Sequence, residues 1–299
     1  MITSSQYMEK EKGTIVGVGE ILWDIFPGGR VLGGAPANFA YHASQFGFDG
    51  YAVSAVGNDV LGREILDTLS KKRLNHMVEI VDYPTGTVQV TLDANGVPKY
   101  EICEEVAWDN IPFTAQMERL AVSCCAVCFG SLAQRSAVSR TTINRFLDLI
   151  PSDSYKIFDI NLRQHYYDFD IIHASLLKSN ILKINDEELY AIANLFGMTD
   201  LSEQEICLQL MQRYNLKIVV ETKGAIGSYI FTDTETSYID TPKVKVVDTV
   251  GAGDSFTGAF IVSLLNGKSI RESHQMAVDV SAYVCGQKGG MPTLLGTAP

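Results

Sequence analysis

A short segment near the C-terminal end of the chain combines two glycines with an acidic residue at the expected start of a helix. An apolar extended stretch leads into Gly251-Ala252-Gly253, and Asp254 follows directly. The N–H groups of such a turn lack intrahelical partners and the helix dipole adds positive potential, so together they form an anion site. A carboxylate beside that site is suited to accept a proton from a hydroxyl that attacks a phosphoryl group.

Helix capping is the alternative interpretation of Asp254, because Asp often caps helices or pairs with their dipole. Capping alone, however, does not require two glycines directly before the carboxylate. Two other nucleotide-binding motifs are excluded. The segment Gly17-Val-Gly19 lacks the third glycine of a dinucleotide fingerprint, since Leu22 stands there. The segment Gly267-Lys268-Ser269 lacks the first glycine of a P-loop, since Val262 occupies that position.

Two further motifs have a sufficient structural explanation and leave function open. Asn185-Asp-Glu-Glu188 precedes a helical pattern, and its spacing matches a capping box in which Asn caps the helix and Glu returns a hydrogen bond. Thr222-Lys-Gly224-Ala-Ile-Gly227 lies between two apolar segments and can be a tight turn between strands. Spacing alone does not separate these readings from ligand binding.

Side chains that suit sugar hydroxyls occur near the N-terminus. Asp24 follows the first apolar segment, and Asn38 lies in the first turn of an expected helix. Carboxylate and amide groups fix hydroxyls because they accept and donate hydrogen bonds in defined directions. A turn-forming Asp and a neutral helix Asn are the structural alternatives. Arg163 ends the run 159–163, and its planar guanidinium can bind anionic or polar groups.

The elements that position these residues alternate between apolar segments and helical patterns. Strands are expected at 14–22, 51–56, 123–129, 156–160, 180–184, 217–221 and 227–232, and helices at 36–46, 60–73, 136–149, 186–196, 202–214, 252–265 and 270–286. This alternation predicts an α/β fold with a mostly parallel sheet covered by helices on both faces. No repeat or linker marks a boundary, so we expect a single domain over 1–299.

Residues 85–102 depart from this alternation of strands and helices. They alternate with period two around Asn95-Gly96, which predicts a β-hairpin. A hairpin cannot supply a parallel crossover, so it is expected to project from the main sheet as a small antiparallel flap. The flap is either a surface meander or a lid, since ligands in such folds bind outside the carboxyl ends of the strands.

Composition excludes several classes of protein. The chain has 299 residues, with 24 Lys and Arg against 35 Asp and Glu, and a net charge of −11, which argues against a nucleic-acid partner. The longest apolar stretch, 121–133, is too short and too interrupted to span a membrane. The N-terminus lacks the pattern of a signal peptide, so we expect a cytoplasmic protein. Cys125 and Cys128 are then interpreted as core thiols in a reducing compartment.

The chain resembles the ribokinase-like (PfkB) sugar kinases. Asp248-Thr-Val-Gly-Ala-Gly-Asp254 is similar to their C-terminal signature, and Gly33-Gly34-Ala-Pro-Ala-Asn38 to their N-terminal one, with a colinear match from Ile15 to Pro292. The resemblance implies a three-layer α/β/α core with a small antiparallel β lid formed by about 21–33 and 85–107. It also implies ATP as the phosphoryl donor and Mg²⁺ as a cofactor.

The resemblance further implies roles for the residues that would bind ATP, the phosphoryl donor, and its metal ions. Asp254 would be the catalytic base, and in the turn that begins at Gly251 the N–H groups of Ala252, Gly253 and Asp254 would hold the transferring phosphoryl group. Asn185 and Glu188 would organise Mg²⁺ through water. The remaining donor-side assignments are a nucleotide-binding loop with Thr222, Gly224 and Gly227, and a monovalent-cation (K⁺) site with Asp248 and the carbonyl of Val250.

The sugar would accept the phosphoryl group, and we call its part of the site the acceptor side. There the resemblance implies that Asp24 and Asn38 bind the sugar, that Gly33 and Gly34 form a hinge, and that Arg163 lies near the sugar or its product. The runs 129–132, 159–163 and 183–185 look most like fructokinases.

Phosphoryl transfer from ATP to the primary hydroxyl of free fructose, giving fructose 6-phosphate, is therefore the expected function. Few cationic residues besides Arg30 and Arg163 lie near the sugar motifs, which favours a free sugar over a sugar phosphate. The alternatives are a kinase of ribose, 2-keto-3-deoxygluconate or a nucleoside, and a non-catalytic sensor of sugar or nucleotide. Exposed lid edges also suggest a homodimer through the lid, which light scattering would test.

Overall fold

A nine-stranded sheet forms the centre of the computed structural model, which describes residues 13–92 and 98–294. In spatial order its strands are β13 (Thr236–Asp240), β12 (Gly227–Thr232), β11 (Ile218–Thr222), β10 (Ile181–Asn185), β9 (Tyr155–Asp159), β8 (Cys124–Phe129), β1 (Thr14–Val18), β4 (Asp49–Gly57) and β5 (Asn75–Val81). Every neighbouring pair from β11 to β5 is parallel, whereas β12 and β13 are antiparallel additions. The predicted, mostly parallel sheet is confirmed.

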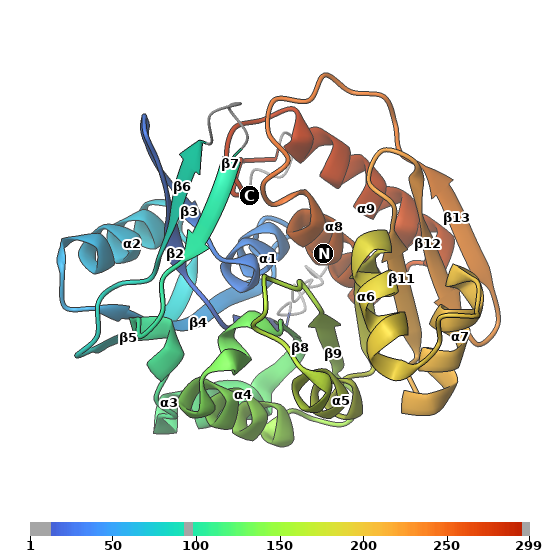
Figure 1. The fold of residues 1–299 in the computed structure, drawn as a ribbon, viewed down its shortest axis with the longest axis horizontal. Coiled ribbons are helices and arrows are strands. Elements are labelled where there is room, and N and C mark those ends of the chain that lie inside the picture. Colours follow the sequence, from blue (N-terminus) through green and yellow to red (C-terminus); the bar gives the residue numbers. More distant parts are fainter. Residues whose placement is uncertain (1–12, 93–97, 295–299) are drawn as a thin grey trace, which may run out of the picture.

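Helices cover both faces of this sheet (Figure 1). The helices are α1 (Ala35–Ser44), α2 (Val60–Lys71), α3 (Ala115–Ser123), α4 (Ala137–Leu149), α5 (Phe169–Lys178), α6 (Asp186–Phe196), α7 (Glu203–Tyr214), α8 (Ala252–Leu265) and α9 (Ile270–Cys285). In β1, Ile15 packs in one hydrophobic cluster with residues of α1, α8 and α9, while Val16 and Val18 pack in another with residues of α3 to α7. This alternation follows from the period of two along a strand. The three-layer α/β/α core is thus confirmed.

A second sheet of four strands stands beside the large one (Figure 1). Its order is β3 (Gly29–Gly33), β2 (Leu22–Phe26), β6 (Thr87–Leu92) and β7 (Pro98–Ile102). The predicted hairpin is confirmed as the antiparallel pair of β6 and β7, although its turn at Asn95-Gly96 lies outside the described residues. The outer pairs are antiparallel, but β2 and β6 run parallel, a pairing between distant segments that a hairpin pattern does not reveal.

The sequence pattern misplaced several boundaries. The strand expected at 14–22 is divided, because the chain turns at Gly19, with φ at +152°, and leaves the large sheet for the small one. The pattern also missed β5, α3, α5 and β13. Both β5 and β13 are edge strands with few fully buried residues, so they lack the continuous apolar run of a central strand. Within residues 13–92 and 98–294, no helix has the length and apolarity required to cross a membrane.

Close approach of α1 to β1 depends on one glycine. A Cβ atom at Gly17 would lie 1.8 Å from the carbonyl oxygen of Pro36, so no side chain fits there without moving the helix. We expect Gly17→Ala to lower the free energy of unfolding by about 1–3 kcal/mol, the usual cost of overpacking. Urea unfolding would measure the change. The matched control is Gly28→Ala, where an added Cβ meets nothing within 4 Å; equal losses in both variants would contradict this packing argument.

Candidate active site

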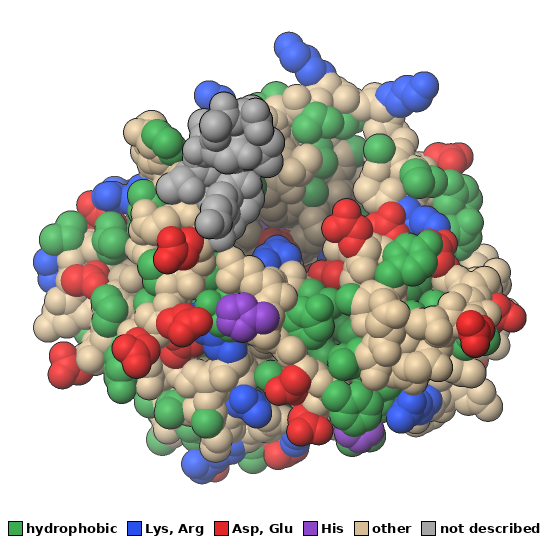
Figure 2. Space-filling model, viewed as in Figure 1, with side chains coloured by type: hydrophobic (Ala, Val, Ile, Leu, Met, Phe, Trp, Pro, Cys, Tyr) green, Lys and Arg blue, Asp and Glu red, His purple; other side chains and the backbone are tan. Residues whose placement is uncertain are grey.

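A cavity of about 680 Å³ lies between the small sheet and the carboxyl ends of the parallel strands. Figure 2 shows its opening as a hollow with acidic side chains at the rim. Ligands of open α/β sheets bind at this edge, because the loops there leave a crevice. The structure brings most of the predicted site residues to its lining, namely Asp24, Gly33, Gly34, Asn38, Arg163, Asn185, Glu188, Thr222, Val250, Gly251, Gly253 and Asp254.

The glycine turn forms as the sequence predicts and begins α8. Gly251 caps the helix with φ at +76°, a backbone conformation that favours glycine, and an added Cβ would lie 2.5 Å from the backbone of Gly290. Gly251 has no side chain with which to cap the helix, and the Asp254 carboxylate accepts a hydrogen bond from the Asn38 side chain. The N–H of Ala252 donates to the carbonyl of Thr249 (3.2 Å). Within the described part of the chain, the N–H groups of Gly253 and Asp254 have no acceptor and remain available to an anion.

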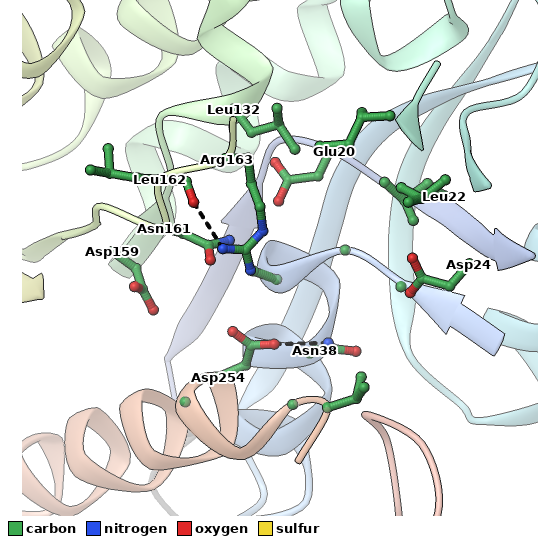
Figure 3. A pocket seen from close by; sticks show the side chains of 18 of the residues that line it. Glu20, Leu22, Asp24, Asn38, Leu132, Asp159, Asn161, Leu162, Arg163 and Asp254 are labelled. Atoms are coloured by element: carbon green, nitrogen blue, oxygen red, sulfur yellow. Dashed lines mark hydrogen bonds between the residues drawn. The ribbon is translucent and has the colours of Figure 1, made fainter. Parts of the chain in front are cut away.

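Asp254 itself is held by a hydrogen bond from α1. Nδ2 of Asn38 donates to its Oδ2 at 2.8 Å, as Figure 3 shows. Burial, and secondarily the nearby Asp159 carboxylate, raises the pKa of Asp254 to about 6, although Asn38, Lys183 and Arg163 oppose the rise. A carboxylate with a pKa near the working pH can both accept and release a proton. The geometry therefore provides a proton acceptor next to an anion site.

A buried ion pair lies behind the glycine turn, and the sequence analysis did not identify it. Nζ of Lys183 in β10 lies 2.9 Å from Oδ1 of Asp159 at the end of β9, and both side chains are buried. An added Cβ at Gly253 would lie 3.2 Å from this Nζ, so the ammonium group adjoins the turn. The signal in the sequence is a lysine inside the apolar strand 181–184, because an unpaired charge is rarely buried there.

Asn185 and Glu188 form the capping box that the spacing predicts. The side chain of Asn185 accepts from the N–H of Glu188 (2.8 Å), and Oε2 of Glu188 accepts from the N–H of Asn185 (2.9 Å). Oε1 of Glu188 also accepts from the N–H of Leu162 (2.9 Å), which ties the helix to the loop that carries Arg163. Both capping residues still line the cavity, so capping and ligand contact are compatible.

No group of three or more His, Cys, Asp or Glu residues in the described ranges is arranged to enclose a metal ion. Mg²⁺ does not need such a cage, because it retains several waters and uses one or two carboxylates. The side-chain oxygens of Asn185 and Glu188 each accept one backbone N–H and keep a second lone pair, which fits a hydrogen bond from a water bound to Mg²⁺.

Around Arg163, the described lining of the cavity holds several acids. In Figure 3 the guanidinium of Arg163 projects into the cavity, with Glu20, Asp24 and Asp254 around it. Arg163 donates to the carbonyl of its neighbour Leu162 (3.0 Å), and its charge opposes the raised pKa values of all three acids. Burial raises the pKa of Asp24 to about 6.

Two predicted hinge glycines connect the small sheet to α1. An added Cβ at Gly33 would lie 2.7 Å from Oδ2 of Asp24, so glycine leaves space for that carboxylate. Gly34 precedes the first residue of α1 and has φ at +122°. The side chain of Glu20, which follows β1, also lines the cavity, and the sequence analysis missed it. Its signal was a polar residue just after a central strand, the position where ligands of such sheets bind.

Four predicted residues do not line the cavity. Gly224 lies in the turn between β11 and β12, where its carbonyl accepts from the hydroxyl of Thr241 (2.7 Å), and Gly227 is the first residue of β12. Ala252 contributes to the turn through its backbone alone. Asp248 accepts from the N–H of Val250 (3.0 Å) and from that of Gly289 (2.9 Å), so it joins two loops beside the cavity.

The chain is similar in sequence to curated proteins over most of its length. The chain is 29% identical to an ATP-dependent 6-phosphofructokinase of Thermoanaerobacterium thermosaccharolyticum, over 85% of this chain and 79% of that protein. It is 28% identical to a fructokinase of Klebsiella pneumoniae, over 94% of this chain and 96% of that protein.

Two solved structures share the fold. Fructokinase of Xylella fastidiosa with bound ATP has a TM-score of 0.83 and 19% identity, covering 94% of each chain. A fructokinase double mutant of Vibrio cholerae with fructose, ADP and potassium bound has a TM-score of 0.78 and 22% identity, covering 95% of each chain. The pattern of the pfkB family carbohydrate kinases matches residues 28–295. The chain therefore belongs to the pfkB family of carbohydrate kinases, phosphotransferases that act on a sugar hydroxyl.

Proposed function

We propose that this kinase transfers the γ-phosphate of ATP to the primary hydroxyl of free fructose, giving fructose 6-phosphate. The observation that carries the proposal is the position of Asp254. Its carboxylate shares one cavity with the polar side chains around Arg163 and with two N–H groups of α8 that have no acceptor among the described residues. The names of the fructokinase relatives and the ATP bound to a structural neighbour support both substrates.

In this mechanism Asp254 accepts the proton of the sugar hydroxyl as that oxygen attacks the γ-phosphorus in line. The N–H groups of Gly253 and Asp254 donate to the transferring phosphoryl group, whose charge spreads over its outer oxygens. Lys183 adds positive potential behind the turn, but its pairing with Asp159 keeps it from neutralising the base. Bound Mg²⁺, held through water by Asn185 and Glu188, would neutralise phosphate charge.

Charge balance favours a free sugar over a sugar phosphate. Among the described lining residues, the cations are Arg163 and Lys183, and Lys183 is paired. Arg163 alone faces Glu20, Asp24 and Asp254. A phosphate group on the acceptor would therefore meet more negative than positive charge. The similarity to a 6-phosphofructokinase makes fructose 6-phosphate the acceptor that most needs a direct test.

Asp248 and the carbonyl of Val250 are proposed to border a monovalent-cation site. The two hydrogen bonds that Asp248 accepts hold the 248–250 and 289 loops together beside the anion turn. A cation there would attract the anionic phosphates without contacting the sugar. Potassium in a fructokinase of the same fold supports this assignment.

Replacing the proposed base should abolish most turnover. We expect Asp254→Asn to lower kcat by about 10²–10⁴-fold, the usual contribution of a general base, while fructose affinity changes little. In the parent enzyme kcat/KM should fall about tenfold per pH unit below pH 6, because the pKa of Asp254 is about 6 and its protonated form cannot accept a proton. Asp279→Asn, on the exposed side of α9, is the control. Near-parental turnover in Asp254→Asn would refute the assigned base.

A panel of acceptors tests the substrate. ADP release should be fastest with fructose and at least about tenfold slower with ribose, 2-keto-3-deoxygluconate, adenosine and fructose 6-phosphate, a modest discrimination for a polar site. Each assay is run in potassium and in sodium-only buffer, and we expect faster release in potassium. Preference for fructose 6-phosphate would overturn the substrate, and equal rates in both buffers would overturn the cation site. Sugar binding without ADP release would indicate a sensor instead of a kinase.

A further inference from the structure

Among the residues that the structure describes, Glu20 has a buried carboxyl oxygen without a hydrogen-bond partner. The residue lies two positions after the end of β1, and its side chain enters the cavity next to Arg163 (Figure 3). Only 4% of the residue is exposed, and within residues 13–92 and 98–294 its Oε2 has no hydrogen-bond partner. Glu20 lies outside residues 28–295, which the family pattern matches, and outside the two signature segments at 33–38 and 248–254.

Keeping this carboxyl buried is unfavourable for the unliganded protein. Burial raises the pKa of Glu20 to about 7; its own N–H, the Arg163 guanidinium and the N–H of Ala35 limit the rise, and Asp254 adds to it. A buried polar group without a hydrogen bond destabilises a fold, and an apolar side chain of similar volume is usually tolerated better. Residues that weaken a fold in this way are typical of binding sites, where stability and function compete.

The surroundings of Glu20 indicate what completes its hydrogen bonding. The carboxyl lies on the acceptor side, near Arg163 and Asp254, and Asp24 lines the same side from β2. Glu221, another buried carboxylate with an unpartnered oxygen, differs because that oxygen lies 3.9 Å from Nζ of Lys223 and outside the cavity. A ligand inside the cavity is therefore the available partner for Oε2 of Glu20.

We propose that Glu20 binds a hydroxyl of a neutral sugar acceptor through its free carboxyl oxygen and disfavours acceptors that carry an anionic group. This inference rests on the proposed function and adds a specificity-determining residue to it. A hydroxyl can satisfy a carboxyl group in either protonation state, since it both donates and accepts. A phosphate or carboxylate cannot donate in its ionised form, and it would add charge to a side of the cavity that already holds three acids around Arg163.

Two variants separate this role from a structural one. Glu20→Met keeps length and apolar volume but removes both oxygens, and Glu20→Gln keeps hydrogen bonding but removes the charge. For Glu20→Met we expect the KM and the calorimetric Kd for fructose to rise about 10–100-fold, the loss of one hydrogen bond to a charged group, with the KM for ATP within about twofold of the parent's. Its Tm without ligand should rise. For Glu20→Gln the kcat/KM ratio of fructose over fructose 6-phosphate should fall at least about fivefold.

Unchanged fructose affinity in Glu20→Met would overturn the inference, and a lowered Tm together with unchanged affinity would assign Glu20 a structural role. Glu118→Gln, which alters an exposed ion pair with Arg145, controls for loss of an acid elsewhere and should change none of these values. Calorimetric binding keeps the two proposals distinguishable. If the parent binds fructose but does not phosphorylate it, the proposed function fails while the Kd values still test Glu20. If it binds no neutral sugar, the role of Glu20 is refuted as well.

Discussion

The rest of the site depends on one constraint: the carboxylate of Asp254 is buried but is not paired with a cation. A carboxylate next to an ammonium group would be stabilised as an anion and would be a poor proton acceptor. Here Lys183 pairs with Asp159, and Asp254 receives a neutral amide hydrogen bond from Asn38. Burial therefore determines its proton affinity. The same lysine adjoins the glycine turn, so positive potential reaches the place where phosphate charge would lie without neutralising the base.

The fold creates this arrangement by joining segments that are distant in sequence. Asn38 and Asp254 are 216 positions apart, and they meet because α1 and α8 pack on the same face of the large sheet. Strands β9 and β10 bring Asp159 and Lys183 together because their parallel register pairs these two positions. The small sheet adds Asp24 opposite them. Each element is stabilised mainly by apolar packing, which offsets the unfavourable burial of several acids around one cavity.

Local patterns in the sequence predicted the alternating strands and helices, the hairpin and the glycine turn, since each depends on residues close together in the chain. Most of the site residues that we predicted from motifs line the cavity. The exceptions are Gly224, Gly227, Asp248 and Ala252. The parallel pairing of β2 with β6 could not be predicted, because no short-range pattern specifies which distant strands meet. Glu20 was missed for a related reason: its place after a central strand is only a weak signal, and its burial without a partner among the described residues emerges only in the folded structure.

A crystal structure with fructose and a non-hydrolysable ATP analogue is the most direct test of this account. It should place the terminal phosphate against the N–H groups of Gly253 and Asp254, with the primary hydroxyl of the sugar within about 3 Å of an Asp254 carboxylate oxygen. A terminal phosphate bound elsewhere, or a sugar whose primary hydroxyl points away from Asp254, would contradict it.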